Sequence, residues 1–310
     1  MIKKLLYIFI ILLTGCTTDF TGLEKSEESV YIRFSTAVDI HVDVSEATRS
    51  RMSEEETLVG VLGIGTQAES LSLTTLAGYD TTSLRQWMAN DAYYLYDRSF
   101  EHTLGQQPSF PIEDGSAVAA YAYLPYTKHI VYGIDSCYIP IDLMADSATT
   151  DWMYTGRVAR TKAEYREEPT FAFNFHHAMT RLDLVLSPEI ATNDTVEILE
   201  IDLGMYNHGK GRLSLENGIV SLDTATCNPD SIYRLRRRLA DVRLASQDGA
   251  EHTEVLYLMP YTKLHDLRIV GVWNGADTLY YEHCIDTTRW NSANLHPGKR
   301  SVINIKSIRK

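Results

Sequence analysis

The sequence contains little cysteine: only Cys16, Cys137, Cys227 and Cys284 occur in 310 residues. Their spacings are wide, and no pair has the CxxC spacing that is typical of zinc sites. The sequence therefore predicts no disulfide framework, no bound metal and no cofactor. Whether any two of Cys137, Cys227 and Cys284 form a bridge stays open.

The chain also lacks an excess of positive charge. It has 29 Lys and Arg residues against 41 Asp and Glu residues, which gives a formal net charge of −12. Attraction to phosphate groups is the main non-specific force in nucleic-acid binding, so no nucleic acid is expected among the partners. The same acidity argues against binding to anionic membrane surfaces.

Catalytic motifs are missing as well: the sequence has no GxSxG elbow, no HExxH motif and no EF-hand loop. Gly204–Gly211 (GMYNHGKG) is close to a phosphate-binding loop, but Gly211 stands where that loop needs Ser or Thr. His176 and His177 are neighbours on a predicted strand and point to opposite faces, so they cannot chelate one ion. The sequence predicts no catalytic residue and no enzyme.

The one long hydrophobic run lies at the start of the chain. Lys3 and Lys4 precede nine apolar residues, Leu5–Leu13, which are too few to span a bilayer as a permanent helix. Residues 1–16 are therefore predicted to be a secretory signal. Its end, Leu13-Thr14-Gly15-Cys16, resembles a lipobox, so Cys16 is the predicted lipidation site. The alternative is a plain signal peptide with a chance cysteine.

After a polar tether over residues 17–29, apolar and polar residues alternate in many short segments. Ala37–Val44 is the clearest, because Val38, Ile40, Val42 and Val44 share one face of an extended strand. The same pattern predicts strands at Phe171–Phe175, Leu182–Leu186, Val196–Leu203, Val255–Met259, Leu267–Trp273 and Val302–Ile305. Helix signals are few, with one or two turns expected over Ser83–Ala89. The pattern predicts an all-β protein built of β-sandwiches.

Two Asn-Gly pairs lie between apolar runs, at Asn217-Gly218 and Asn274-Gly275, and each predicts a hairpin with a type I′ turn. The polar segment Leu222–Asp230 separates two strand-rich halves. We therefore expect an N-terminal domain over residues 30–225 and a C-terminal domain over residues 226–310.

The order of several segments resembles the bacterial fimbrillin family, the subunits of type V pili. The segments are Val30–Phe34 with Ala47-Thr48-Arg49, Leu58–Ile64, Ala89–Tyr96, Ala119–Tyr126, Asp151–Tyr154, Phe175–Leu186, Trp290 and Pro297-Gly298-Lys299 with Ser301–Ile305. This resemblance covers most of the mature chain. It implies two Greek-key, transthyretin-like β-sandwich domains and export as a lipoprotein to the outer membrane.

The resemblance also implies that a trypsin-like, Arg-specific protease cuts after the first strand. Arg49 and Arg51 occupy that position, with ordinary loop residues as the alternative. The strand to be displaced would contain Val30, Ile32, Phe34, Val38, Ile40, Val42 and Val44. If the four β-branched side chains of the segment Val38–Val44 are buried, at about 2 kcal/mol each, removing that segment forfeits roughly 8 kcal/mol of stability. That is comparable to the net stability of a domain, about 5–15 kcal/mol, so an opened subunit would bind a replacement strand by β-augmentation.

The carboxyl end is a modest donor for the next subunit. Val302, Ile303, Ile305 and Ile308 are the candidate donor residues, but they divide between two strand faces. The segment could instead be the last strand of its own domain. A tip subunit, which accepts a strand without giving one, is slightly favoured, while stalk and anchor roles stay open.

The sequence thus predicts a structural fimbrial subunit that contributes to adhesion, with other fimbrial subunits as partners. It would be found at the outer membrane, through its lipid, and in the fimbria. The alternative is a lipid-anchored surface lipoprotein that recognises glycans or a host protein. Exposed tryptophan would serve such binding by stacking on sugars, and the candidates are Trp87, Trp152, Trp273 and Trp290.

Overall fold

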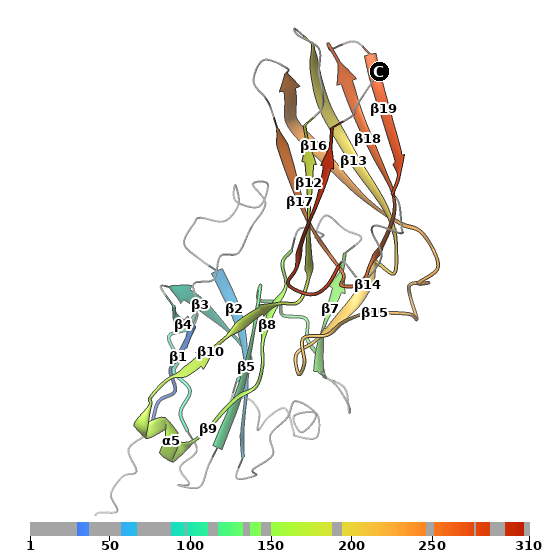
Figure 1. Ribbon diagram of the computed structural model, residues 1–310. Helices are drawn as coiled ribbons and strands as arrows, with labels where there is room; N and C mark the ends of the chain where they lie inside the picture. The colour runs from blue at the N-terminus through green and yellow to red at the C-terminus, as the bar shows by residue number, and fades with distance from the viewer. Residues whose placement is uncertain are drawn as a thin grey trace, which may run out of the picture.

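The computed structural model describes residues 30–36, 57–66, 88–96, 98–110, 117–132, 137–143, 150–187, 194–245, 251–275, 277–285 and 295–306. Within these ranges the chain is almost entirely β-strand, with one short helix, α5 (Lys162–Glu167). The expected all-β sandwich architecture is confirmed. Figure 1 shows two strand-rich regions, with the carboxyl-terminal strands gathered at one end of the molecule.

The N-terminal region is built on a nine-stranded sheet with the order β10-β1-β4-β3-β2-β5-β8-β11, with β9 also paired to β5. All its neighbours are antiparallel except β1 and β10, which run parallel. The strands are β1 (Phe34–Thr36), β2 (Thr57–Thr66), β3 (Ala89–Tyr96), β4 (Ser99–His102), β5 (Ala117–Leu124), β8 (Met153–Thr155), β9 (Val158–Thr161), β10 (Phe171–Phe173) and β11 (Phe175–His177).

A smaller sheet with the order β15-β14-β7-β6 joins distant parts of the sequence. It contains β6 (Val131–Tyr132), β7 (Cys137–Asp142), β14 (Lys210–Ser214) and β15 (Val220–Leu222). Its central pair is antiparallel, with Gly211 opposite Ile141 and Leu213 opposite Ile139. This hairpin from the second half of the chain therefore completes a sheet begun in the first half.

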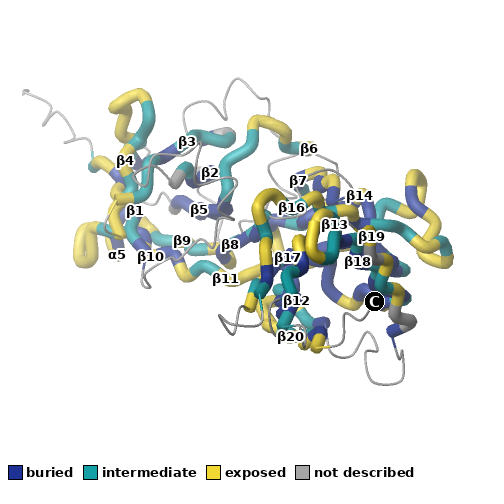
Figure 2. Tube along the Cα trace, turned by 90° about the horizontal axis from the view of Figure 1, so that it is seen from above, coloured by how far each residue is buried: buried dark blue, intermediate teal, exposed yellow. Residues whose placement is uncertain are grey.

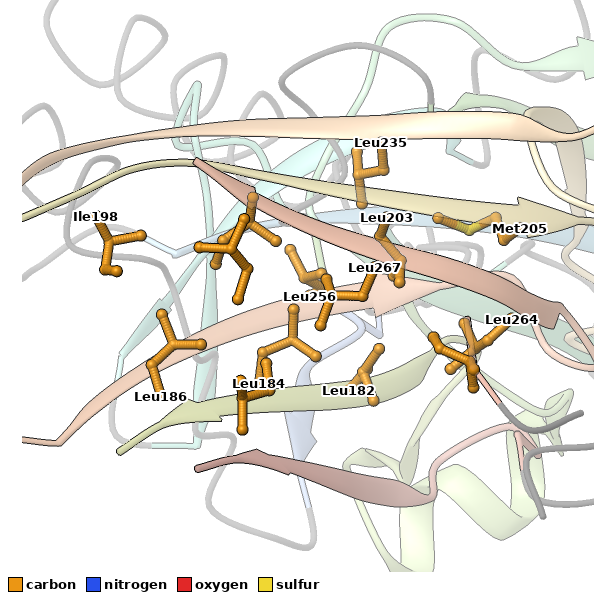
Figure 3. Close-up of a cluster of buried hydrophobic side chains, with 14 of the residues drawn as sticks. Leu182, Leu184, Leu186, Ile198, Leu203, Met205, Leu235, Leu256, Leu264 and Leu267 are labelled. Carbon is orange, nitrogen blue, oxygen red and sulfur yellow. The ribbon is translucent and has the colours of Figure 1, made fainter. Parts of the chain in front are cut away.

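The C-terminal region is a sandwich of two sheets, β17-β12-β20 and β16-β13-β18-β19. The strands are β12 (Thr180–Leu186), β13 (Thr195–Tyr206), β16 (Tyr233–Ala245), β17 (His252–Leu258), β18 (Lys263–Trp273), β19 (Asp277–Cys284) and β20 (Arg300–Ile305). Alternate leucines of β12 point inward and pack against side chains of the facing sheet, as Figure 3 shows. The period-two pattern of the sequence thus becomes the inner face of the sandwich.

Buried hydrophobic side chains form three clusters. Figure 2 marks the buried residues in dark blue along the Cα trace, and they occur in both strand-rich regions. The first cluster fills the C-terminal sandwich, and the second is formed by residues of the nine-stranded sheet and the segments packed on it. The third lies where the small sheet packs between the nine-stranded sheet and the C-terminal sandwich. The boundary expected between residues 225 and 226 stays a prediction. The C-terminal cluster takes residues of β12 and β13, which precede that position, together with residues of β16, β17, β18 and β20.

The predicted strands over the described residues are found, but one turn differs from expectation. Asn274 and Gly275 have φ angles of 49° and 73°, the positive values that a type I′ turn requires, in the hairpin that joins the paired residues Trp273 and Asp277 of β18 and β19. The two-residue turn predicted at Asn217-Gly218 is wrong, because residues 215–219 separate β14 from β15. There the Asn217 side chain accepts a hydrogen bond from the Ile219 amide and supports a longer loop.

Candidate functional site

The first strand is bonded along both of its edges. On one side, the Ile32 amide donates to the Pro108 carbonyl at 2.7 Å and the Val30 carbonyl accepts from the Phe110 amide at 2.9 Å. On the other side, the Arg33 carbonyl accepts from the Phe171 amide at 2.9 Å. Residues 30–36 therefore lie within the sheet, between two segments that come later in the sequence. We call this place the first-strand groove.

The floor of the first-strand groove is aromatic. Phe34 is 4% exposed, and its ring lies 5.4 Å from Phe173, 5.5 Å from Tyr93, 5.8 Å from Phe171 and 6.2 Å from Phe100. Ile32 is 2% exposed and belongs to the same cluster. Each fully buried side chain of this size contributes about 1.5–3 kcal/mol, so the strand is a substantial part of this core.

Helix α5 supplies a contact to the first strand that was not predicted. Its Tyr165 hydroxyl accepts a hydrogen bond from the Arg33 amide at 2.7 Å and donates one to the Tyr31 carbonyl at 3.0 Å. The helix begins with a capping box, in which Thr161 accepts from the Glu164 amide and Glu164 accepts from the Thr161 amide. The spacing Thr-x-x-Glu was a signal for this helix in the sequence.

Several predicted site residues lie outside the described residues. These are the lipidation site Cys16, the cleavage candidates Arg49 and Arg51, the strand residues Val38, Ile40, Val42 and Val44, the donor candidate Ile308, and Trp87 and Trp290. Of the remaining tryptophans, Trp152 and Trp273 are half-buried and pack against hydrophobic clusters. A role of these tryptophans in sugar binding stays a prediction.

The described donor candidates belong to β20, which pairs in parallel with β12. Ile305 is 5% exposed and lies in the C-terminal cluster, and Ile303 packs against that cluster. Val302 faces the other way and is 38% exposed. The segment thus forms part of the sandwich of its own chain.

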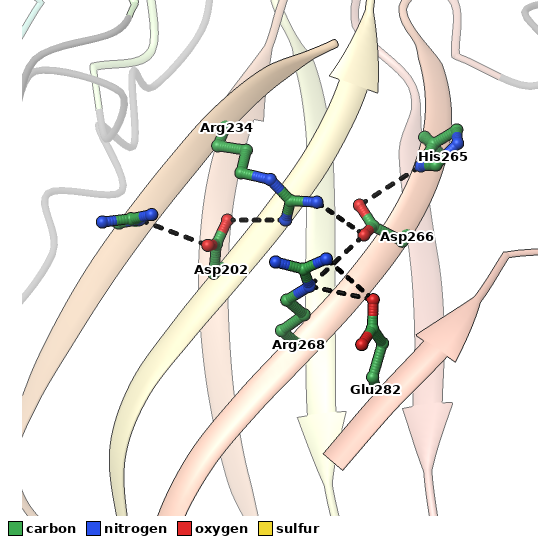
Figure 4. Close-up of polar contacts among 7 residues, drawn as sticks. Asp202, Arg234, His265, Asp266, Arg268 and Glu282 are labelled. Atoms are coloured by element: carbon green, nitrogen blue, oxygen red, sulfur yellow. Dashed lines mark hydrogen bonds and ion pairs between the residues drawn. The ribbon is translucent and has the colours of Figure 1, made fainter. Parts of the chain in front are cut away.

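An ion-pair network covers the outer face of β16, β13 and β18, as Figure 4 shows. Arg234 bridges two buried carboxylates, with Nη1 3.3 Å from Asp202 Oδ1 and Nη2 2.7 Å from Asp266 Oδ2. Burial alone would raise the pKa of Asp266, but hydrogen bonds from Arg234 and His265 outweigh it, so the pKa is lowered. Arg234 thus holds two buried carboxylates in place across three neighbouring strands, which is a structural arrangement.

The part of the chain that the structure describes contains no cluster of three or more His, Cys, Asp or Glu side chains suited to a metal ion. His177 Nδ1 lies 2.6 Å from Asp151 Oδ2, while His176 contacts the Tyr154 ring. The two histidines thus have separate partners. Cys227 is buried and unpaired, and Cys137 and Cys284 lie on β7 and β19.

A pocket of about 310 Å³ lies between the two regions, lined by residues that include His177, Arg181, Tyr257 and Arg300. Its arginines are held by a buried carboxylate: Arg181 Nε and Arg300 Nε donate to Asp183 at 2.7 and 2.6 Å.

Among the described residues, no helix is long and apolar enough to cross a membrane.

Comparison with known proteins identifies the family. The model of the fimbrillin-like family matches residues 48–309, and the chain belongs to that family. A search of the curated proteins finds no match.

Two solved structures have a similar fold. A candidate cell adhesion protein from Bacteroides uniformis is 15% identical, with a TM-score of 0.55 over 90% of this chain and 94% of that one. A candidate cell adhesion protein from Bacteroides ovatus is 14% identical, with a TM-score of 0.50 over 90% and 91% of the two chains. At these identities the likeness shows the fold.

Proposed function

We propose that the protein is a structural subunit of a fimbria on the cell surface, where it contributes to adhesion. It is exported as a lipoprotein acylated at Cys16, held at the outer membrane, and cut by an Arg-specific protease at Arg49 or Arg51. The cut releases the first strand, and a strand from another subunit replaces it. Membership of the fimbrillin-like family supports the class of protein.

The observation that most supports strand replacement is the position of the first strand. Residues 30–36 have bonded neighbours on both edges, and their inward side chains lie in an aromatic core. Removing them would expose backbone groups on two sides and an apolar floor. Both features favour binding of another extended segment.

The surroundings of β20 favour a tip role over a stalk role. A subunit that donated β20 would withdraw Ile303 and Ile305 from its own C-terminal cluster and break the ladder with β12. Accepting a strand costs the chain no such contact. We therefore propose that this chain accepts a strand in the fimbria and does not donate β20.

The experiment compares the full-length wild type with the double variant Arg49→Gln, Arg51→Gln after mild trypsin treatment. Mass spectrometry locates the cut, and a fluorescent peptide of residues 28–37 measures strand capture. The cut wild type should capture the peptide and the double variant should not. The control Arg238→Gln removes a guanidinium whose side chain is 92% exposed and should behave as wild type. Equal capture by cut and uncut chains would contradict the proposal.

A further inference from the structure

The Tyr165 hydroxyl occupies a place in the β-ladder of the first strand. β1 and β10 pair in parallel with Phe34 opposite Phe171, so the next step of the ladder places Ile32 opposite Pro169. In a parallel ladder, the residue at the position of Pro169 would donate its N–H to the carbonyl of the residue before Ile32. Its own carbonyl would accept from the N–H of the residue after Ile32. Those two groups are the Tyr31 carbonyl and the Arg33 amide.

Pro169 cannot make this pair of bonds, because proline has no N–H. The Tyr165 hydroxyl makes both of them: it donates to Tyr31 at 3.0 Å and accepts from Arg33 at 2.7 Å. The Tyr165 hydroxyl from α5 thus makes the two hydrogen bonds that a residue with an N–H at position 169 would make. The first strand consequently keeps a bonded partner at Tyr31 and Arg33, ahead of the point where β10 begins.

The hydroxyl is held in a fixed position. Tyr165 is 1% exposed, and its ring lies 4.9 Å from Phe110 and 5.6 Å from Phe171. Burial raises the pKa of its phenol, so the group stays protonated and keeps its donor at neutral pH. If the first strand left, this buried hydroxyl would lose both strand contacts, which is costly unless a new strand restores them.

We propose that the Tyr165 hydroxyl selects for a backbone N–H at the Arg33 position of any strand that occupies the first-strand groove, and we call this the selection role of Tyr165. This inference rests on the proposed strand replacement and names the kind of partner. The partner is an extended segment with a large aromatic residue at the Phe34 position and an aliphatic residue at the Ile32 position. At the Arg33 position it has any residue except proline, because the Arg33 side chain is exposed and the strand is held there through its main-chain N–H and carbonyl, of which proline lacks the N–H.

Side-chain alternation alone does not give this selectivity. A slip by one residue turns the apolar face outward and is excluded in any sheet with one buried face. A slip by two residues keeps the apolar face inward and is distinguished by the fit of Phe34 among its four rings. A proline at the Arg33 position leaves both apolar side chains in place, and the Tyr165 bond is what excludes it.

The test uses the full-length chain cut with trypsin, which is then inhibited, and the fluorescent peptide of residues 28–37. A second peptide carries an ester in place of the Arg33 amide, which removes the N–H donor with little change of shape. We expect the ester to weaken capture by the wild type about tenfold. With Tyr165→Phe, the amide peptide should also bind about tenfold more weakly, and the ester should cost little more.

Tyr93→Phe is the matched control, because Tyr93 lies in the same cluster and its hydroxyl contacts the Met88 sulfur at 3.4 Å. It should retain the full ester penalty. An ester penalty that is equal in the wild type and in Tyr165→Phe would overturn the selection role of Tyr165 while leaving strand replacement intact. Failure of the cut wild type to capture any peptide would overturn strand replacement, and the selection role with it.

Hydrogen exchange on the intact wild type gives a measurement that needs no variant. The Arg33 amide should be protected as strongly as the Thr36 amide, which donates to the Arg98 carbonyl at 2.9 Å. Fast exchange at Arg33 with slow exchange at Thr36 would overturn the selection role of Tyr165 even if Tyr165→Phe fails to fold.

Discussion

Individual residues of the C-terminal sandwich are fixed by the need to pair buried charge. Asp202 and Asp266 are 5% and 2% exposed, and both are held by Arg234 from the edge strand β16. Gly204 lies opposite Asp266 in the ladder, and its lack of a side chain leaves the space that the Asp266 carboxylate occupies. Gly204 therefore provides the space that the ion-pair network needs.

Gly204→Ala should destabilise the fold, because the new Cβ would overlap Asp266 Oδ1. We expect the free energy of unfolding to fall by about 1–3 kcal/mol, the usual cost of overpacking. Urea denaturation measures it. Gly156→Ala is the control, because Gly156 is exposed and a methyl group added there would meet no heavy atom within 4 Å. A loss as small as that of Gly156→Ala would show that the carboxylate can move without cost.

The burial of His208 should make the free energy of unfolding depend on pH. It is fully buried near Thr262, and burial lowers its pKa from 6.5 to about 4, with a smaller opposing effect from the Leu143 backbone. The unfolded chain therefore takes up a proton between pH 6.5 and 4 that the folded chain does not, so stability falls as the pH falls. We expect a loss of about 2 kcal/mol between pH 7 and pH 5.

Urea denaturation at the two pH values checks this. His208→Asn keeps a polar group near Thr262 without titrating in this range, so it should remove most of the pH dependence. An unchanged pH dependence in the variant would assign it to other groups.

Among the strands, β12 has a central place because it pairs with β17 on one side and with β20 on the other. β20 closes the sandwich with Ile303 and Ile305, while Val302 faces outward. The last strand of the described chain is thus a structural element of the C-terminal region.

Ile305→Ala should lower the free energy of unfolding by about 3 kcal/mol, as for other aliphatic side chains removed from a core. Val302→Ala, on the exposed face of the same strand, should cost less than about 1 kcal/mol. Urea denaturation of both variants gives the comparison. Similar small losses would mean that β20 adds little to its own domain, and this would remove the argument against β20 as a donor.

The strands could be predicted from sequence because alternation is a local pattern, and it located β12, β13, β17 and β18. The Tyr165 contact could not, since Tyr165 and Tyr31 lie 134 residues apart and no local pattern links them. The Asn217 loop differs from prediction because an Asn-Gly pair permits several loops. The boundary is hard to place because β14 pairs with β7 across the two halves of the chain.

At the scale of the whole molecule, the first strand and the C-terminal sandwich belong to different hydrophobic clusters. Ile32 and Phe34 lie in the cluster of the nine-stranded sheet, whereas Leu184, Ile198 and Ile269 lie in the C-terminal one. Loss of the first strand removes contacts from the cluster of the nine-stranded sheet and none from the cluster of the C-terminal sandwich. The molecule could thus open at one end and stay folded at the other.

Hydrogen exchange of the cut chain tests this separation. After trypsin treatment and removal of the released segment by gel filtration, deuterium uptake should rise in β4, β10 and residues 108–110. These segments hold the first strand. Uptake in β12, β13 and β18 should stay unchanged, because their ladders and their cluster contain no first-strand residue. A parallel rise in the second set would show that the sandwich depends on the first strand. Strand loss would then unfold the subunit, and an accepting subunit could not wait for its partner in a folded state.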